Sequence, residues 1–172
     1  MARRNVQLDL RPLQALRRAT LRANLSAGGG APEYEAMYRQ WRVRYLAFIQ
    51  RRYDRMSRGG WPPLAESTKR RRRGDGDQAA ILKDTGTLFN SLDISRADNF
   101  RRIAGGVRVG FLSGQRGAGD APTISELGAI HHFGRGHIPQ RTIIVQPDQQ
   151  VIAGMMADTR RATQRIMARL GR

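Results

Sequence analysis

The chain of 172 residues contains no cysteine, only two lysines, only 14 acidic residues and no long apolar run. The absence of cysteine excludes disulfides and metal sites built from thiolates. No apolar run approaches the roughly 18 residues of a membrane-spanning helix. No secretory signal peptide follows the basic N-terminus, Met1–Asn5. We therefore expect a protein without a membrane partner that stays in a cytoplasm-like compartment until it assembles.

The charge is strongly one-sided. The chain has 31 basic residues, of which 29 are arginines, and its formal net charge is +17. A GC-rich genome that replaces lysine by arginine explains the ratio of the two, but it does not explain the deficit of acids. A charge of this size repels itself in an isolated monomer, so we expect a polyanion or an acidic partner surface nearby.

The basic residues are densest between Arg51 and Arg73, where nine cations accompany two acidic residues, Asp54 and Glu66. These nine are the candidate contacts to a partner or to DNA: Arg51, Arg52, Arg55, Arg58, Lys69, Arg70, Arg71, Arg72 and Arg73. The arginine side chain binds phosphates and carboxylates in bidentate geometry. A charge run of this kind is also typical of a solvated loop, and the sequence leaves that interpretation open.

The first 31 residues are set apart from the rest. Their leucines recur at helical spacing from Leu10 to Leu25, and the breaker Ser26–Pro32 follows. We expect residues 1–31 to form a basic arm with a glycine hinge that contacts a neighbouring subunit or ring, and residues 32–172 to form the main domain.

Hydrophobic periodicity predicts a long helix from about Glu33 to Met56, ended by Gly59-Gly60-Trp61. Its apolar stripe is more typical of a core than of a platform for stacking bases. The stripe comprises Tyr34, Met37, Tyr38, Trp41, Tyr45, Phe48, Ile49 and Arg52. The stretch after the helix, including the basic run, is expected to be irregular. A short helix is predicted from Thr85 to Leu92, with Asp84 or Thr85 as its N-cap and Leu88, Phe89 and Leu92 facing inward.

In the second half of the chain, parts of the hydrophobic pattern change from helical spacing to strand-like alternation. Alternation from Ile103 to Phe111 predicts a strand, and the β-branched run Thr142–Val145 predicts another. Ile124–Phe133 predicts a helix whose Ile130 and Phe133 dock on the sheet. Pro147 is expected to be the first residue of a final helix to Leu170, with an apolar side that includes Met167. The order predicts an α+β fold: N-terminal helices, a small antiparallel sheet, a C-terminal helix and long flexible loops.

No pattern in the sequence indicates a catalytic, cofactor-binding or metal-binding site. The three histidines, His131, His132 and His137, lack the acidic or cysteine partners that would complete a metal site. The glycine-rich segment at 114–119 lacks the Lys-Ser/Thr ending of a phosphate loop. We therefore expect no enzyme and no cofactor.

Four segments carry a resemblance to a known family. They are Trp61-Pro62-Pro63-Leu64 before the basic run, Ile81–Leu92, Val107–Gly110 leading to Ile130–Gly134, and Ile138–Arg141. In this order they resemble the phage virion morphogenesis family, which includes Mu-type and related tail-completion proteins. Ile81–Leu92 is similar to the family's L-x-D-T-G-x-L-x-x-S element, and Ile138–Arg141 to its I-P-A-R-P-F-L segment. Thr142 and Ile143 depart from the pattern, because the family usually has proline and phenylalanine there.

The resemblance implies a structural virion protein at the head–tail junction or the head-proximal tail end, either a tail-completion (terminator) or a neck protein. It implies a homo-oligomeric ring, expected to be hexameric, around the channel for the passing genomic DNA. The implied partners are adjoining phage neck or tail proteins and, without sequence specificity, DNA. The implied locations are the virion and, during assembly, the host cytoplasm. A free, sequence-independent nucleic-acid-binding protein is the alternative, although no helix-turn-helix, zinc-finger or RNP pattern is present.

Overall fold

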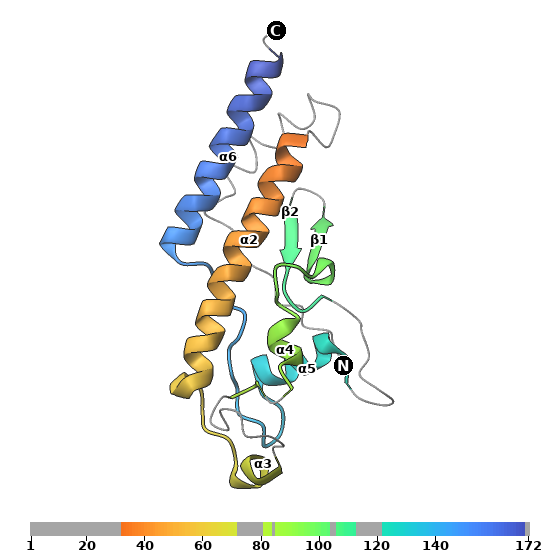
Figure 1. Cartoon of the computed structure of the whole chain (residues 1–172), viewed down its shortest axis with the longest axis vertical. Coiled ribbons are helices and arrows are strands. Elements are labelled where there is room, and N and C mark those ends of the chain that lie inside the picture. Colours follow the sequence, from red (N-terminus) through yellow and green to blue (C-terminus); the bar gives the residue numbers. More distant parts are fainter. Residues whose placement is uncertain (1–31, 72–80, 84, 104–105, 113–121, 171–172) are drawn as a thin grey trace. The chain divides into compact units, whose positions relative to one another are not determined.

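The computed structural model describes residues 32–71, 81–83, 85–103, 106–112 and 122–170 (Figure 1). The predicted arm, Arg72, Arg73 and the whole glycine-rich segment at 114–119 lie outside these residues. The described elements are α2 (Pro32–Arg55), a π-helical turn η2 (Met56–Gly60), α3 (Glu66–Arg71), α4 (Thr87–Asn90), a 3₁₀ turn η3 (Ala97–Asn99), β1 (Phe100–Ile103), β2 (Gly106–Val109), α5 (Ile124–Phe133) and α6 (Gln149–Leu170). The two strands form one antiparallel sheet, and the predicted α+β class is confirmed.

The chain divides into two compact units. The described residues of the first unit fall within positions 1–45, 101–108 and 146–172, and those of the second within 46–100 and 109–145. Helix α2 contributes its first half to the first unit and its second half to the second.

In the first unit, α2 and α6 pair in antiparallel orientation. Near the end of α6, Arg169 lies 3.3 Å from Glu33 at the start of α2. Further along, the indole Nε1 of Trp41 donates to the carbonyl oxygen of Met155 over 2.9 Å. Apolar residues of both helices are buried, which stabilises the first unit by roughly 1.5–3 kcal/mol for each large side chain. They are Tyr34, Met37, Tyr38, Trp41 and Tyr45 from α2, and Val151, Met155, Ala162 and Ile166 from α6.

These contacts confirm the predicted long helix and the assignment of its aromatic stripe to a core. The final helix differs from the prediction at its start. It begins at Gln149, and the side chain of Asp148 caps it by accepting the backbone N–H of Val151 over 2.8 Å. Met167 is 63% exposed and does not belong to the apolar side, because the inward stripe passes through its neighbour Ile166.

The predicted strand from Ile103 to Phe111 is wrong in its extent. Ile103 ends β1, and a separate strand, β2, begins at Gly106 and ends at Val109. The two residues between the strands, Ala104 and Gly105, lie outside the described part of the chain. In the first unit Arg102 of β1 reaches α2: its guanidinium lies 2.8 Å from Glu35 and 4.1 Å from the ring centroid of Tyr38.

The second unit is built around Tyr53 near the end of α2. Its ring packs edge-on against Trp61 and Phe89, with centroid distances of 5.0 and 5.1 Å. Its hydroxyl donates to the carbonyl oxygen of Leu82 over 2.8 Å. Leu88 and Leu92 are buried, as predicted, whereas Phe89 is only half-buried.

The helix predicted from Thr85 to Leu92 is shorter and is capped differently. Helix α4 covers only Thr87–Asn90, and its N-cap is Gly86, which has a φ of 70° and makes no side-chain cap. Glycine adopts this left-handed conformation without steric cost. The hydroxyl oxygen of Thr85, a predicted cap, accepts the backbone N–H of Thr87 over 3.4 Å. The other predicted cap, Asp84, lies outside the described residues.

Two expectations about the segment after α5 are also wrong. Thr142–Val145 forms no strand, because the N–H groups of Ile143 and Ile144 donate to Nδ1 of His132, over 3.2 and 3.3 Å. At the end of α5 itself, Phe133 is 42% exposed rather than facing inward, whereas its neighbour His132 is buried.

Helix α5 begins at the predicted residue. A capping box, in which Thr123 and Glu126 each accept the other's backbone N–H, fixes its start. The helix lies very close to the segment after β2. A Cβ atom on Gly128 would lie only 2.4 Å from Cδ2 of Phe111.

Candidate partner-binding surface

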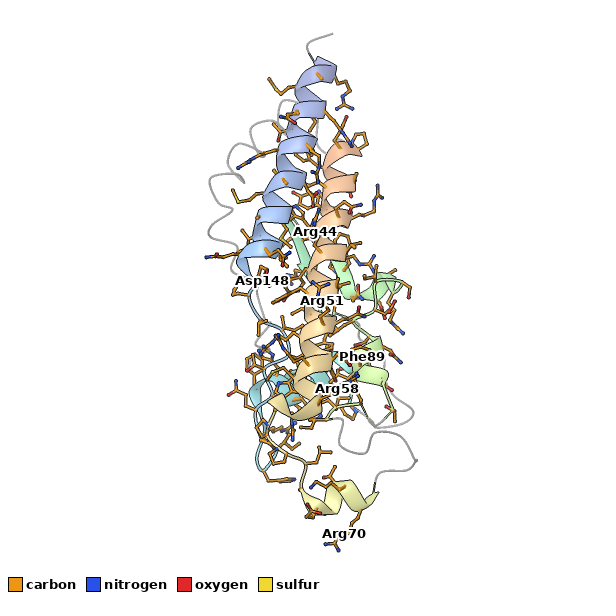
Figure 2. The ribbon with its side chains drawn as sticks, turned by 60° about the vertical axis from the view of Figure 1, so that its left-hand side comes forward. Arg44, Arg51, Arg58, Arg70, Phe89 and Asp148 are labelled. Carbon is orange, nitrogen blue, oxygen red and sulfur yellow. The ribbon has the colours of Figure 1, made fainter. Side chains whose placement is uncertain are left out.

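Three of the nine predicted contact residues lie at the end of α2 and in the turn that follows it; Figure 2 labels two of them, Arg51 and Arg58. Arg51 and Arg55 are four residues apart on α2, the spacing that places side chains on one face of a helix, and Arg58 follows in η2. All three are exposed, and the side chain of Arg58 is 68% exposed. We call these three residues the arginine stripe.

The turn after α2 holds Arg58 at the surface. Within η2, Gly59 has a φ of 124°, a conformation that only glycine adopts freely. Ser57 is fully buried, and its carbonyl oxygen accepts the N–H of Ile81 over 2.9 Å. The chain then turns inward at Trp61, which is 5% exposed. The stripe therefore ends on an anchored turn.

Asp54 is the carboxylate beside the stripe. The ammonium group of Lys83 binds Asp54 and lowers the pKa of that carboxyl group, chiefly through the hydrogen bond. Arg58 lies 3.6 Å from its other oxygen. Among the residues that the structure describes, Arg51 and Arg55 have no carboxylate partner.

Arg52 does not belong to the stripe. It is half-buried, and its Nη2 donates to the carbonyl oxygen of Thr142 over 3.5 Å. Arg52 therefore holds the irregular segment after α5 against α2, which is a structural role.

The basic run begins on a helix, where the sequence predicted irregular structure. Helix α3 spans Glu66–Arg71, with the acidic Glu66 at its N-terminus, where the helix dipole favours a negative charge. Lys69 lies 2.6 Å from Glu66, one turn away. Lys69 and Arg70 are exposed. The side chain of Arg71, together with Arg72 and Arg73, is outside the described part of the chain.

The acidic side chains described in the second unit are each engaged locally. Asp54 binds Lys83, Glu66 binds Lys69, Asp98 binds Arg96, Asp93 accepts from Ser95, and Glu126 accepts from Thr123. Within this described part, Asp54 is shared between Lys83 and Arg58, and no carboxylate remains for Arg51 or Arg55. The structure thus brings Arg51, Arg55 and Arg58 together as a surface of excess positive charge, and it separates them from Arg52 in role.

Arg141 is a residue that sequence reasoning assigned to a motif without a role. It is 4% exposed, and its Nη2 donates to the carbonyl oxygens of Pro62 and Pro63, over 3.3 and 3.5 Å. Its backbone N–H donates to the carbonyl oxygen of His131 over 2.7 Å. In the sequence, the one sign of this structural role was the position of Arg141, a single arginine after Ile138-Pro139-Gln140 and away from the basic run.

His131 and His132 make structural contacts: His132 accepts backbone N–H groups through Nδ1, and the carbonyl oxygen of His131 accepts the N–H of Arg141. Burial lowers the pKa of His132, and burial together with the charge of Arg141 lowers the pKa of His131. His137 is exposed on the turn that follows α5. Across the described ranges, no three histidine, cysteine or acidic side chains gather in a way that could hold a metal ion. The same ranges contain no helix long and apolar enough to cross a membrane.

Comparison with known proteins gives no match: no family model, no curated protein and no solved structure is significantly similar to the chain.

Proposed function

We propose that the chain is a non-enzymatic structural component of a tailed-bacteriophage particle, at the head–tail junction or the head-proximal tail end. In this proposal it assembles with copies of itself into a ring, expected to be hexameric, that meets adjoining neck or tail proteins. The observation that carries the proposal is the way in which the motif segments contact one another in the second unit.

The first of these contacts joins the Trp-Pro-Pro segment to the Ile138–Arg141 segment through the two hydrogen bonds from Arg141 to Pro62 and Pro63. The second joins Arg141 to the Ile130–Gly134 segment through the carbonyl oxygen of His131. The third links the Ile81–Leu92 segment to Trp61 indirectly, because the ring of Tyr53 in α2 packs against both Phe89 and Trp61. These contacts gather residues of the Trp61–Leu64, Ile81–Leu92, Ile130–Gly134 and Ile138–Arg141 segments in the second unit, and this structural context supports the resemblance.

Exposed apolar side chains support assembly. The described residues leave four large hydrophobic side chains exposed: Val43, Ile103, Phe133 and Met167. Phe133 and Met167, at 42% and 63% exposure, are the most open of the four. Aromatic residues and methionine are enriched at protein–protein interfaces. We propose that such residues contact neighbouring subunits, and that the arm of residues 1–31, outside the described residues, adds a further contact.

Particles assembled without this protein test the location. The expected result is separated filled heads and tails. Intact, infectious particles would contradict the proposal. Size-exclusion chromatography with light scattering tests the ring: a defined oligomer, alone or on a purified neck protein, is expected. Deletion of residues 1–27 should leave a folded protein that no longer assembles, and normal assembly of that variant would exclude the arm as a contact.

A free nucleic-acid-binding protein is the second candidate, favoured by the exposed arginine stripe. It predicts a monomer that binds DNA and is absent from purified particles. Mass spectrometry of purified particles separates the two candidates directly.

A further inference from the structure

We infer that the arginine stripe of α2 is a binding surface for the phosphate backbone of double-stranded nucleic acid. This inference selects Arg51, Arg55 and Arg58 from the nine basic candidates and assigns Arg52 a structural role. It rests on the proposed function for the identity of the duplex, which would be the packaged genome.

The first argument is the charge that the protein leaves uncompensated. Arg51 and Arg55 are exposed and have no carboxylate partner among the described residues, while Asp54 is engaged by Lys83. The other acids described in the second unit are bound to their own neighbours. The described residues thus leave Arg51 and Arg55 open to an external anion, and duplex nucleic acid has the densest negative charge of the common polyanions.

The second argument is geometric. A helix rises about 1.5 Å per residue, so Arg51 and Arg55 are offset by about 6 Å along α2. That offset is close to the axial rise of about two nucleotides in one strand of a duplex. The two guanidinium groups on α2 can thus reach neighbouring phosphates of one strand, and Arg58 in η2 extends the positive surface beyond the end of the helix.

The third argument separates a nucleic-acid backbone from an acidic protein surface. The exposed large hydrophobics of the described chain are Val43, Ile103, Phe133 and Met167, and none of them lies between Arg51 and Arg58. Stable protein interfaces are centred on buried apolar and aromatic anchors. Contacts to phosphates need no such anchor, and they carry no sequence information.

The lack of exposed aromatic rings near the arginine stripe, among the described residues, favours a duplex over a single strand as its partner. Proteins that grip single strands stack the bases on exposed aromatic rings. The aromatic side chains of this part of α2 face inward: Tyr53 is 1% exposed, and Trp61 beyond it is 5% exposed. The surface presents guanidinium groups without a stacking ring.

A purely structural explanation is that arginines near the end of α2 stabilise the helix by interacting with its dipole. Arg52 and Arg55 lie in the last turn, where a positive charge is favourable. This explanation accounts for Arg55, but it does not account for Arg51, which lies one turn earlier.

The test measures binding of the full chain to a random-sequence 30-base-pair duplex by fluorescence anisotropy, at several salt concentrations. The stripe variant combines Arg51→Gln, Arg55→Gln and Arg58→Gln. The control combines Arg39→Gln, Arg160→Gln and Arg165→Gln, which removes the same charge from exposed arginines outside the stripe. Removal of three phosphate contacts should lower the slope of log K against log salt by about 3, and affinity by about tenfold or more. The control variant should keep the wild-type slope. Replacement of the three stripe residues by lysine should restore most of the binding, because the charge is retained.

Four outcomes would overturn the inference. In the first two, the wild-type chain does not bind the duplex, or the stripe and control variants lose equal duplex affinity. In the other two, the wild-type chain binds a single strand more tightly than the duplex, or the stripe variant loses binding to poly-glutamate while its duplex binding is unchanged. Light scattering on the same samples separates this test from that of the proposed function. A stripe variant that assembles normally but binds duplex weakly supports the inference, whereas one that fails to assemble but binds duplex normally would assign the stripe to a protein interface.

Discussion

The carboxylate of Asp158 accepts a hydrogen bond from Arg44 over 2.7 Å, although the two residues are 114 positions apart in the chain. Asp158 is buried on α6, and Arg161, one turn further along, also binds it. The bond to Asp158 raises the pKa of Arg44. One buried carboxylate thus joins two arginines and fixes the register between α2 and α6 in the first unit.

Replacement Asp158→Asn should lower the free energy of unfolding by about 1.5–3 kcal/mol, because it removes hydrogen bonds between charged groups from a buried position. Urea denaturation measures the change. Glu66→Gln is the matched control: its bond to Lys69 is exposed, so the expected change is below about 1 kcal/mol. Equal effects for the two variants would refute a special role for Asp158.

Replacement Leu88→Ala should destabilise the protein by about 2–5 kcal/mol, since Leu88 is 4% exposed and its removal leaves a cavity in the second unit. Differential scanning calorimetry measures the fall in melting temperature. Asn90→Ala, at an exposed position on the same short helix, should have little effect. An unchanged melting temperature for Leu88→Ala would mean that the segment does not pack as described.

The stability should fall as the pH is lowered from about 7 to 5. Burial depresses the pKa of His131 and His132 below the unfolded value of about 6.5. The unfolded state therefore binds more protons than the folded state just below pH 6.5, and stability is fully present only above that value. Protonation of His132 would also place a proton on the nitrogen that accepts the N–H groups of Ile143 and Ile144.

The variant His132→Asn retains a hydrogen-bond acceptor near that nitrogen but cannot gain a proton in this range. Melting temperatures at pH 5 and 7 should therefore differ less for this variant than for the wild type. His137→Asn, at an exposed position outside these contacts, should retain the wild-type difference. A wild-type melting temperature that is constant between pH 5 and 7 would contradict the expected linkage.

Replacement Arg141→Gln should release the Trp61-Pro62-Pro63 segment, because the shorter side chain cannot reach both proline carbonyl oxygens. In a Trp41→Phe background, where Trp61 is the one remaining tryptophan, the emission should shift to longer wavelength as Trp61 gains contact with water. The exposed Arg135→Gln serves as the control and should leave the emission unchanged. An unshifted spectrum for the Arg141 variant would show that other contacts hold Trp61.

Much of the fold could be predicted where one physical rule acts alone. The aromatic spacing from Tyr34 to Ile49 defined α2, because a long helix with a single buried face leaves a clear 3.6-residue period. The bounds of α5 were predicted correctly, since Gly134 directly follows its last residue, Phe133.

The errors occurred where long-range contacts outweighed local preference. Thr142–Val145 has the composition of a strand, but a histidine 11 residues before Ile143 takes its backbone donors. Glu66–Arg71 is rich in charge and was expected to be irregular, yet the pairing of Glu66 with Lys69 accompanies a helix. Periodicity placed Arg52, but not its neighbour Arg51, on the apolar stripe of α2, and the structure leaves Arg52 half-buried and Arg51 exposed. It could not predict the long-range partner of Arg52, the carbonyl oxygen of Thr142.

The near-contact of Gly128 with Phe111 has a consequence for how this sequence can vary. A side chain at position 128 would require the ring of Phe111 to move, since even a Cβ atom would lie 2.4 Å from that ring. In homologous chains with this packing, a residue larger than glycine at position 128 should therefore occur only with a smaller residue at position 111. The two positions, one after β2 and one within α5, would then evolve as a linked pair.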